Sequence, residues 1–332
     1  MTTRRNFLRA VSAGTATLAG AGLITSSVVA SSLASEPINW PGNRNIRLGI
    51  AAYSFRSYFG FMKGKTQTPK NGKPMDMFGF LDYCASQKCG AELTSYFFPP
   101  DADDEYYLRI KRHAFLQGVP IVGTAIGNNF TIGKGEKLDQ QIADAKKWID
   151  RAQRMGAPHI RFFAGTRKQL ESSPETMPVA IEALQTCVDY AAENGIFVGV
   201  ENHGQLTAAQ VLEIVKGIDS DWFGVNLDTG NFISDDPYRD LAMCAPHAVN
   251  VQLKMKMKRT DGKAFDADFD RIAKILADAK YRGFVVLEFE EPDPWDNVPA
   301  AMARVRNAFE DDNGKRPGNG SIEGSGANPE AF

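Results

Sequence analysis

Four polar residues lie in or at the ends of apolar runs in the second half of the chain: Glu201, Asp228, Gln252 and Glu288. The runs have the composition of buried strands, and a carboxylate buried there without a partner is costly. One divalent cation could compensate all three acids. Three carboxylates and an amide oxygen form a hard-oxygen set, which suits Mg²⁺ or Mn²⁺ better than Zn²⁺. The alternative is that the acids pair with Lys254, Lys256 or Arg161.

These residues can meet only if the ends of several strands come together. We predict strands at residues 48–54, 91–96, 120–127, 159–164, 197–202, 223–228, 248–254 and 284–289. Helical spacing predicts helices at residues 75–86, 104–117, 138–155, 177–193, 208–218, 237–243, 268–279 and 298–309. This alternation over residues 46–310 predicts an α/β fold, the (β/α)8 TIM barrel, whose active sites lie at the carboxyl ends of the strands. A doubly wound open sheet is the competing fold, but no GxGxxG motif follows a predicted strand.

Three short motifs stand at these strand ends: Val-Glu201-Asn-His-Gly, Leu-Asp228-Thr-Gly-Asn and Val-Leu-Glu288. Over residues 46–310 the pattern resembles the xylose isomerase-like TIM barrels, the sugar phosphate isomerase and epimerase superfamily. The resemblance implies four metal ligands at the ends of strands five to eight, here Glu201, Asp228, Gln252 and Glu288. Gln252 stands where the family has His, and Asn231 stands where the family often has His after Asp-x-Gly.

The resemblance also implies a reaction. Glu201 and Glu288 would be proton-transfer groups on either face of a carbon next to a carbonyl. Such a pair supports isomerisation, epimerisation, or β-elimination from a 3-keto-glycoside, each through an enediolate. Further candidates for substrate binding are His203, Lys254, Arg161 and Asn231.

We therefore predict a metal-dependent sugar isomerase or epimerase, or a carbon–oxygen lyase of the same superfamily. It would act on a free or oxidised sugar or on a 3-keto-glycoside. The alternatives are a non-catalytic sugar-binding barrel with a degenerate metal site and a metal-dependent hydrolase.

Residues 1–34 resemble a twin-arginine export signal, because Arg4 and Arg5 precede a run of small and apolar residues. The run is too weakly hydrophobic for a permanent span, so we expect export, cleavage and a periplasmic or secreted protein without stable membrane insertion. Export favours free sugars or glycosides over sugar phosphates. Residues 311–332, rich in Gly, Asn, Ser and Pro, are predicted to be a disordered tail. The polar residues 63–74 are predicted to form a mobile loop over the barrel mouth.

The composition limits the classes of binding partner that we expect for this protein. The net charge of −2 provides no basic face for nucleic acid. With only 4 His, the chain is a poor match for the His-rich multi-zinc site of endonuclease IV, which shares this barrel. The 4 cysteines are predicted to be buried thiols, with a Cys84–Cys89 disulfide as the alternative. The expected partner is a small carbohydrate, and the resemblance is compatible with a homo-oligomer.

Overall fold

The computed structural model describes residues 36–41 and 46–309. These residues belong to one compact unit. The predicted export signal and the predicted tail lie outside the described residues. Within the described part of the chain, no helix combines the length and the apolar character needed to cross a membrane.

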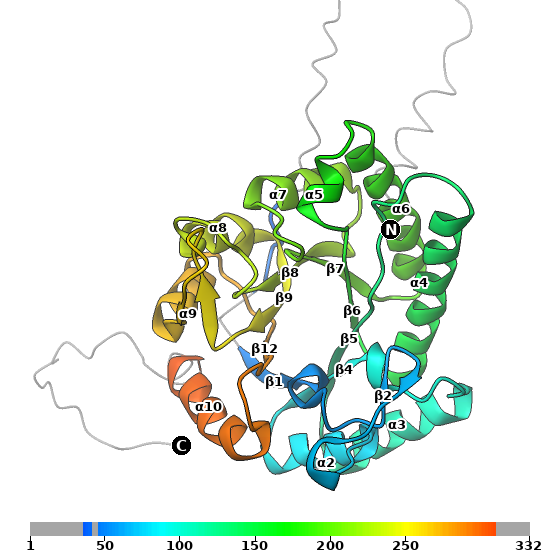
Figure 1. The fold of residues 1–332 in the computed structure, drawn as a ribbon, viewed down its shortest axis with the longest axis vertical. Coiled ribbons are helices and arrows are strands. Elements are labelled where there is room, and N and C mark those ends of the chain that lie inside the picture. Colours follow the sequence, from blue (N-terminus) through cyan, green and yellow to red (C-terminus); the bar gives the residue numbers. More distant parts are fainter. Residues whose placement is uncertain (1–35, 42–45, 310–332) are drawn as a thin grey trace, which may run out of the picture. The chain divides into compact units, whose positions relative to one another are not determined.

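Parallel strands close into a barrel in the order β1-β12-β9-β8-β7-β6-β5-β4 (Figure 1). They are β1 (Arg47–Ala51), β4 (Gly90–Thr94), β5 (Ile121–Ala125), β6 (His159–Phe162), β7 (Phe197–Glu201), β8 (Phe223–Asp228), β9 (Ala248–Leu253) and β12 (Phe284–Leu287). Because parallel strands in a closed barrel all point the same way, their carboxyl ends meet at one rim. The closed barrel confirms the predicted TIM fold and excludes the open sheet.

Helices surround the barrel (Figure 1). They are α2 (Met77–Ser86), α3 (Asp104–Gln117), α4 (Glu136–Met155), α6 (Thr176–Glu193), α7 (Ala208–Gly217), α8 (Pro237–Cys244), α9 (Phe269–Asp278) and α10 (Pro294–Phe309). Several begin at a side-chain oxygen that accepts a backbone N–H, as Asp103 does for α3 and Thr207 does for α7. Helices α3 and α4 end at Gly118 and Gly156, whose φ angles of 68° and 80° suit glycine.

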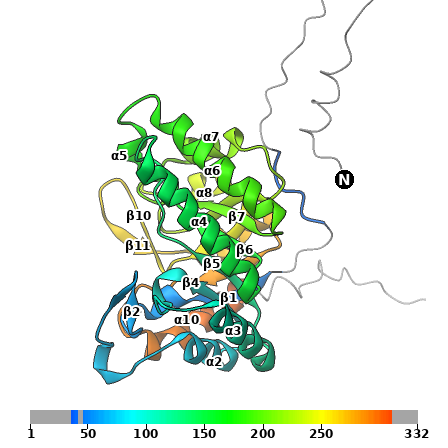
Figure 2. The same cartoon turned by 90° about the vertical axis from the view of Figure 1, so that its right-hand side faces the viewer.

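Short elements extend from the rim where the strands end. They are α5 (Arg167–Leu170), the hairpin of β2 (Phe61–Met62) with β3 (Lys65–Thr66), and the hairpin of β10 (Lys256–Lys258) with β11 (Ala264–Asp266). Figure 2 shows all of them on the same side of the barrel. The sequence did not predict them, because strands of two or three residues carry no readable periodicity. Part of the loop predicted at residues 63–74 is thus regular structure.

The space between the strands and the helices is filled by one large apolar cluster to which almost every strand and helix contributes. All four cysteines are buried within the structure and carry free thiols. This confirms the prediction of buried thiols and excludes the Cys84–Cys89 disulfide.

Candidate active site

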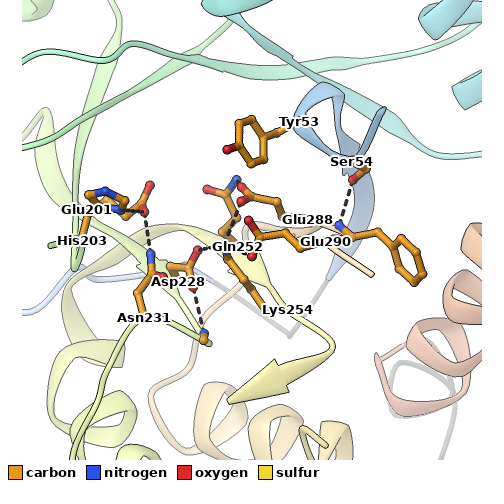
Figure 3. A network of polar contacts seen from close by, with 12 residues as sticks. Tyr53, Ser54, Glu201, His203, Asp228, Asn231, Gln252, Lys254, Glu288 and Glu290 are labelled. Carbon is orange, nitrogen blue, oxygen red and sulfur yellow. Dashed lines mark hydrogen bonds and ion pairs between the residues drawn. The ribbon is translucent and has the colours of Figure 1, made fainter. Parts of the chain in front are cut away.

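Glu201 is the last residue of β7 and is buried. Its carboxylate forms an ion pair with Arg161 of β6, with 2.9 Å between Oε2 and Nε. Its other oxygen, Oε1, accepts a hydrogen bond of 2.8 Å from Asn231 and lies 3.3 Å from His203 Nδ1 (Figure 3). The ring of Phe163 stacks on His203 at 4.1 Å between centroids and lies 4.0 Å from the Arg161 guanidinium. Three of the four predicted substrate-binding residues therefore surround Glu201.

Asp228 is the last residue of β8 and is only 1% exposed. Its Oδ1 accepts a 2.8 Å hydrogen bond from the backbone N–H of Gly230. Its Oδ2 has no hydrogen-bond partner among the described residues, although Lys254 Nζ lies 3.5 Å away. The Asn202 side chain holds this strand end in place, since it accepts from the Asp228 N–H and donates to its carbonyl. One oxygen of a rigidly held carboxylate thus remains available for a further ligand.

Glu288 follows β12 directly and is buried. Lys254, which follows β9, donates from Nζ to Glu288 Oε1 and to Glu290 Oε2, both at 2.8 Å. The backbone N–H of Lys254 donates to Thr229 Oγ1 at 2.9 Å, which ties the end of β9 to the residue after β8. The Lys254 ammonium therefore bridges acids that come from two different strands, Asp228 and Glu288 (Figure 3).

A chain of side-chain amides leads to Glu288. Asn250 Nδ2 donates to Asn226 Oδ1 at 2.8 Å, and Asn226 Nδ2 donates to Gln252 Oε1 at 3.0 Å. Gln252 Nε2 in turn donates to Glu288 Oε2. This direction suits an ionised Glu288, because a carboxylate only accepts hydrogen bonds. Here Gln252 presents its N–H groups to the acid and its oxygen to Asn226, whereas the predicted role as a metal ligand needs that oxygen.

The two acids on β7 and β8 differ in charge environment. Burial raises the pKa of Glu201, but Arg161, His203 and Lys254 together outweigh burial and lower it. At Asp228 burial prevails and raises the pKa well above its ordinary value, with repulsion from Glu201 added and attraction to Lys254 opposing. Glu201 is therefore the acid best suited to remain ionised.

Burial also raises the pKa of Glu288, against the attraction of Lys254. A fourth buried acid, Glu92 of β4, accepts a 2.9 Å hydrogen bond from Thr94 at Oε2. Its Oε1 has no partner in the part of the chain that the structure describes. Burial raises the pKa of Glu92 to about 8, although Arg161 opposes the shift. Buried acids thus outnumber Arg161 and Lys254, the two buried cations of the rim, and the excess charge calls for a proton or an added cation.

The donors fit a divalent cation only in part. Among the described residues, no three or more His, Cys, Asp or Glu side chains are placed closely enough to hold a metal ion. The ion pairs of Arg161 with Glu201 and of Lys254 with Asp228 match the alternative prediction of internal pairing, while Lys256 pairs with Glu291 instead. The excess of acids and the unpartnered Asp228 oxygen nevertheless suit a hard cation, provided that the Lys254 ammonium moves away.

All the predicted site residues lie at this rim, in two groups of contacts, one around Glu201 and one around Lys254. Sequence reasoning missed the roles of Asn226, Asn250 and Glu290. A signal for the two asparagines was present, because alternate residues of a strand share a face. By that rule Asn226 points the same way as Asp228, and Asn250 points the same way as Gln252.

Comparison with known proteins agrees with the fold. The family model described as xylose isomerase-like TIM barrel matches residues 85–308. Because this match covers more than half of the chain, the protein belongs to the xylose isomerase-like TIM barrel family. The family resemblance predicted from the strand-end motifs is thereby confirmed. No curated protein matches the sequence.

Several solved structures share the fold at low sequence identity. A D-psicose 3-epimerase from Clostridium cellulolyticum H10, solved with D-tagatose, is 16% identical with a TM-score of 0.64, over 79% of this chain and 99% of that chain. A magnesium complex of a xylose isomerase-like TIM barrel protein from Mycobacterium smegmatis is 16% identical with a TM-score of 0.62, over 79% and 96%. A 3-keto-D-glucoside 4-epimerase from E. coli is 16% identical with a TM-score of 0.56, over 79% and 100%.

Proposed function

We propose that this chain is a sugar isomerase or epimerase that removes and returns a proton at a carbon next to a carbonyl, through an enediolate. Its substrate would be a free or oxidised sugar or a 3-keto-glycoside. The observation that carries the proposal is the meeting of three buried acids at the ends of β7, β8 and β12 with two cations, the buried Arg161 and the largely buried Lys254, at the catalytic rim of a TIM barrel. The epimerases among the solved relatives support it.

The proposal gives the two glutamates different tasks. Glu201 accepts the proton, because Arg161 and Asn231 hold its carboxylate in the ionised form and in a fixed orientation. Glu288 returns a proton from its protonated form, which burial favours by raising its pKa, while Lys254 and Gln252 hold its side chain in place. Arg161 and His203 both contact Glu201 in the free protein. When substrate binds beside Glu201, the same two side chains are placed to bind substrate oxygens.

We further propose that Glu201, Asp228 and Glu288 hold a divalent cation, with Mg²⁺ or Mn²⁺ favoured over Zn²⁺ by the hard oxygen donors. Such a cation would supply Lewis-acid polarisation of the substrate carbonyl. The free oxygen of Asp228 supports this set. Gln252 does not join it in the observed orientation, because its oxygen accepts from Asn226.

One observation favours a second candidate, a sugar-binding barrel without catalysis. Lys254 already contacts Asp228 and Glu288 from within the protein, and burial raises the pKa of both acids, so a proton together with this ammonium can balance their charge without a metal ion. In that case the rim would bind sugar hydroxyls through its carboxylates and Arg161. The lyase reaction, the twin-arginine export and the homo-oligomer stay predictions.

Solvent exchange tests the enzyme proposal. The purified chain, loaded with Mn²⁺ in D₂O, is incubated with D-psicose, D-tagatose or a 3-keto-glucoside, and deuterium at the carbon next to the carbonyl is followed by NMR. We expect exchange with at least one substrate and a loss of about 100-fold or more in Glu288→Gln. The exposed Glu213→Gln on α7 is the matched control and should exchange normally. Absence of exchange with all three sugars contradicts the enzyme proposal, and exchange with bond cleavage identifies a lyase.

A further inference from the structure

A second cavity lies away from the rim of acids. It measures about 390 Å³ and is lined by residues 38–41 and by residues at or just before the amino ends of β1, β6, β7, β9 and β12. Figure 2 shows the dark-blue segment of residues 36–41 on the side opposite α5 and the two hairpins. The cavity therefore opens at the end of the barrel where the strands begin. Its size lies within the range of small-molecule sites.

One buried polar residue of this cavity is His159, the first residue of β6, which is 6% exposed. Neither ring nitrogen has a hydrogen-bond partner among the described residues. The neighbouring strands make room for the ring with glycines, because a Cβ at Gly123 would lie 2.9 Å from Nδ1 and a Cβ at Gly199 would lie 2.6 Å from Nε2. Burial, with Arg161 adding to it, lowers the pKa of His159 to about 3, so the ring is neutral and offers one donor and one acceptor.

The entrance of the cavity is positively charged. Arg47 and Arg282 line it, and its lining contains no Asp or Glu. Within the described residues, neither arginine forms an ion pair, and Arg282 Nε and Trp40 Nε1 lack hydrogen-bond partners. The remaining walls are mostly apolar, and the Arg47 guanidinium lies 5.6 Å from the centre of the Phe284 ring.

These features do not serve stability. A buried histidine with two unpartnered nitrogens destabilises the fold, and an apolar residue in the same space would avoid the cost. Residues at this end of a TIM barrel ordinarily contribute packing alone. The combination of an apolar cavity, an unpartnered buried imidazole and two unpaired cations is instead the composition of a ligand site.

We propose that this cavity binds a small aromatic carboxylate. The carboxylate meets Arg47 and Arg282 at the entrance, and the ring packs against Trp40 and Phe284. Binding is non-covalent and does not depend on the reaction at the other end of the barrel. The ligand would not be a sugar substrate, because the walls are apolar.

Calorimetric titration of the purified full chain with 4-hydroxybenzoate tests the proposal. We expect saturable binding that is weakened about tenfold or more in Arg282→Gln, because one charge-assisted contact is lost. Val249→Trp, which fills the cavity from β9, should abolish binding. The exposed Arg109→Gln on α3 is the matched control and should bind as the natural chain does. Circular dichroism checks that each variant is folded.

A ligand without the carboxylate tests whether the two arginines contact this group. 4-Hydroxybenzyl alcohol, which lacks the charge, should bind at least about tenfold more weakly. Absence of saturable binding by the natural chain overturns the proposal. Equal binding by Arg282→Gln, or equal binding of the alcohol, also overturns it, because the cations would then play no part.

Discussion

Arg161 and Lys254 form ion pairs with different acids, and this difference indicates which acids can bind an external cation. Arg161 forms an ion pair with Glu201, whereas Lys254 forms ion pairs with Asp228, Glu288 and the half-exposed Glu290. Of the two cations, Lys254 carries the flexible side chain with a single point charge, and it is the one able to swing out toward solvent. Asp228 and Glu288 are therefore the acids whose internal ion pair an external cation can replace, beside Glu201.

The first prediction concerns this competition. In Lys254→Met, the ammonium that repels a cation is removed, so we expect the affinity for Mn²⁺ to rise roughly tenfold. Calorimetric titration of the metal-free protein measures the change. Lys256→Met removes an exposed lysine two residues away that pairs with Glu291, and it should leave the affinity unaltered. A weaker affinity in Lys254→Met would show instead that the lysine holds the acids in place for the metal.

The second prediction concerns Gln252 as a positioning residue. Because its N–H groups face Glu288 and its oxygen faces Asn226, Gln252→Leu should lower the turnover roughly tenfold and leave the Mn²⁺ affinity within about twofold. Asn226→Leu should act in the same direction through Gln252. A large loss of Mn²⁺ affinity in Gln252→Leu would show that Gln252 is a ligand after all.

The third prediction concerns pH. Glu92 keeps its proton in the folded state up to a pKa of about 8, whereas the unfolded chain releases it near 4.5. The folded state therefore binds more protons between these values, and its stability falls as the pH rises from about 4.5 to about 8, by at most about 1.4 kcal/mol per pH unit. In Glu92→Gln this contribution disappears. Urea unfolding of both proteins across this range checks it, and identical slopes would contradict the assignment.

At the scale of elements, the close approach of strands and turns depends on glycine. A Cβ at Gly224 of β8 would lie 2.5 Å from the carbonyl oxygen of His247 and 2.7 Å from Val249. Backbone cannot move aside as a flexible side chain can, so Gly224→Ala should cost about 1–3 kcal/mol of stability. Gly60→Ala, where no atom lies within 4 Å, is the matched control. Equal unfolding midpoints for the two variants would contradict this packing.

The strands also show how much of the fold could be predicted from the sequence. The barrel strands could be predicted because each is an apolar run bounded by polar or turn residues. Glu201 and Asp228 could be predicted as site residues because they are acids at the ends of such runs. Predicted strands 91–96 and 48–54 run past the observed ends, since the chain there turns into the short 3₁₀ helices Ser95–Phe97 and Ala52–Phe55. The choice of partners was beyond prediction, because whether Lys254 contacts Asp228 or solvent depends on distances between strands.

At the scale of the whole molecule, the barrel separates two kinds of environment. The carboxyl rim collects acids in excess, and the amino end presents arginines without acids around His159. The amide chain from Asn250 to Glu288 runs between these ends, because Asn250 also lines the amino-end cavity. The closed barrel thus has an acidic carboxyl end and a positively charged amino end.

The fifth prediction tests the central claim that the acids of the rim form a divalent-cation site. The purified chain, stripped with a chelator, is titrated with Mn²⁺ and with Mg²⁺ by calorimetry. We predict one equivalent bound by the natural chain, a loss of about tenfold or more in Asp228→Asn, and no change in the exposed Asp221→Asn. Absence of binding by the natural chain, or unchanged binding in Asp228→Asn, would contradict the account.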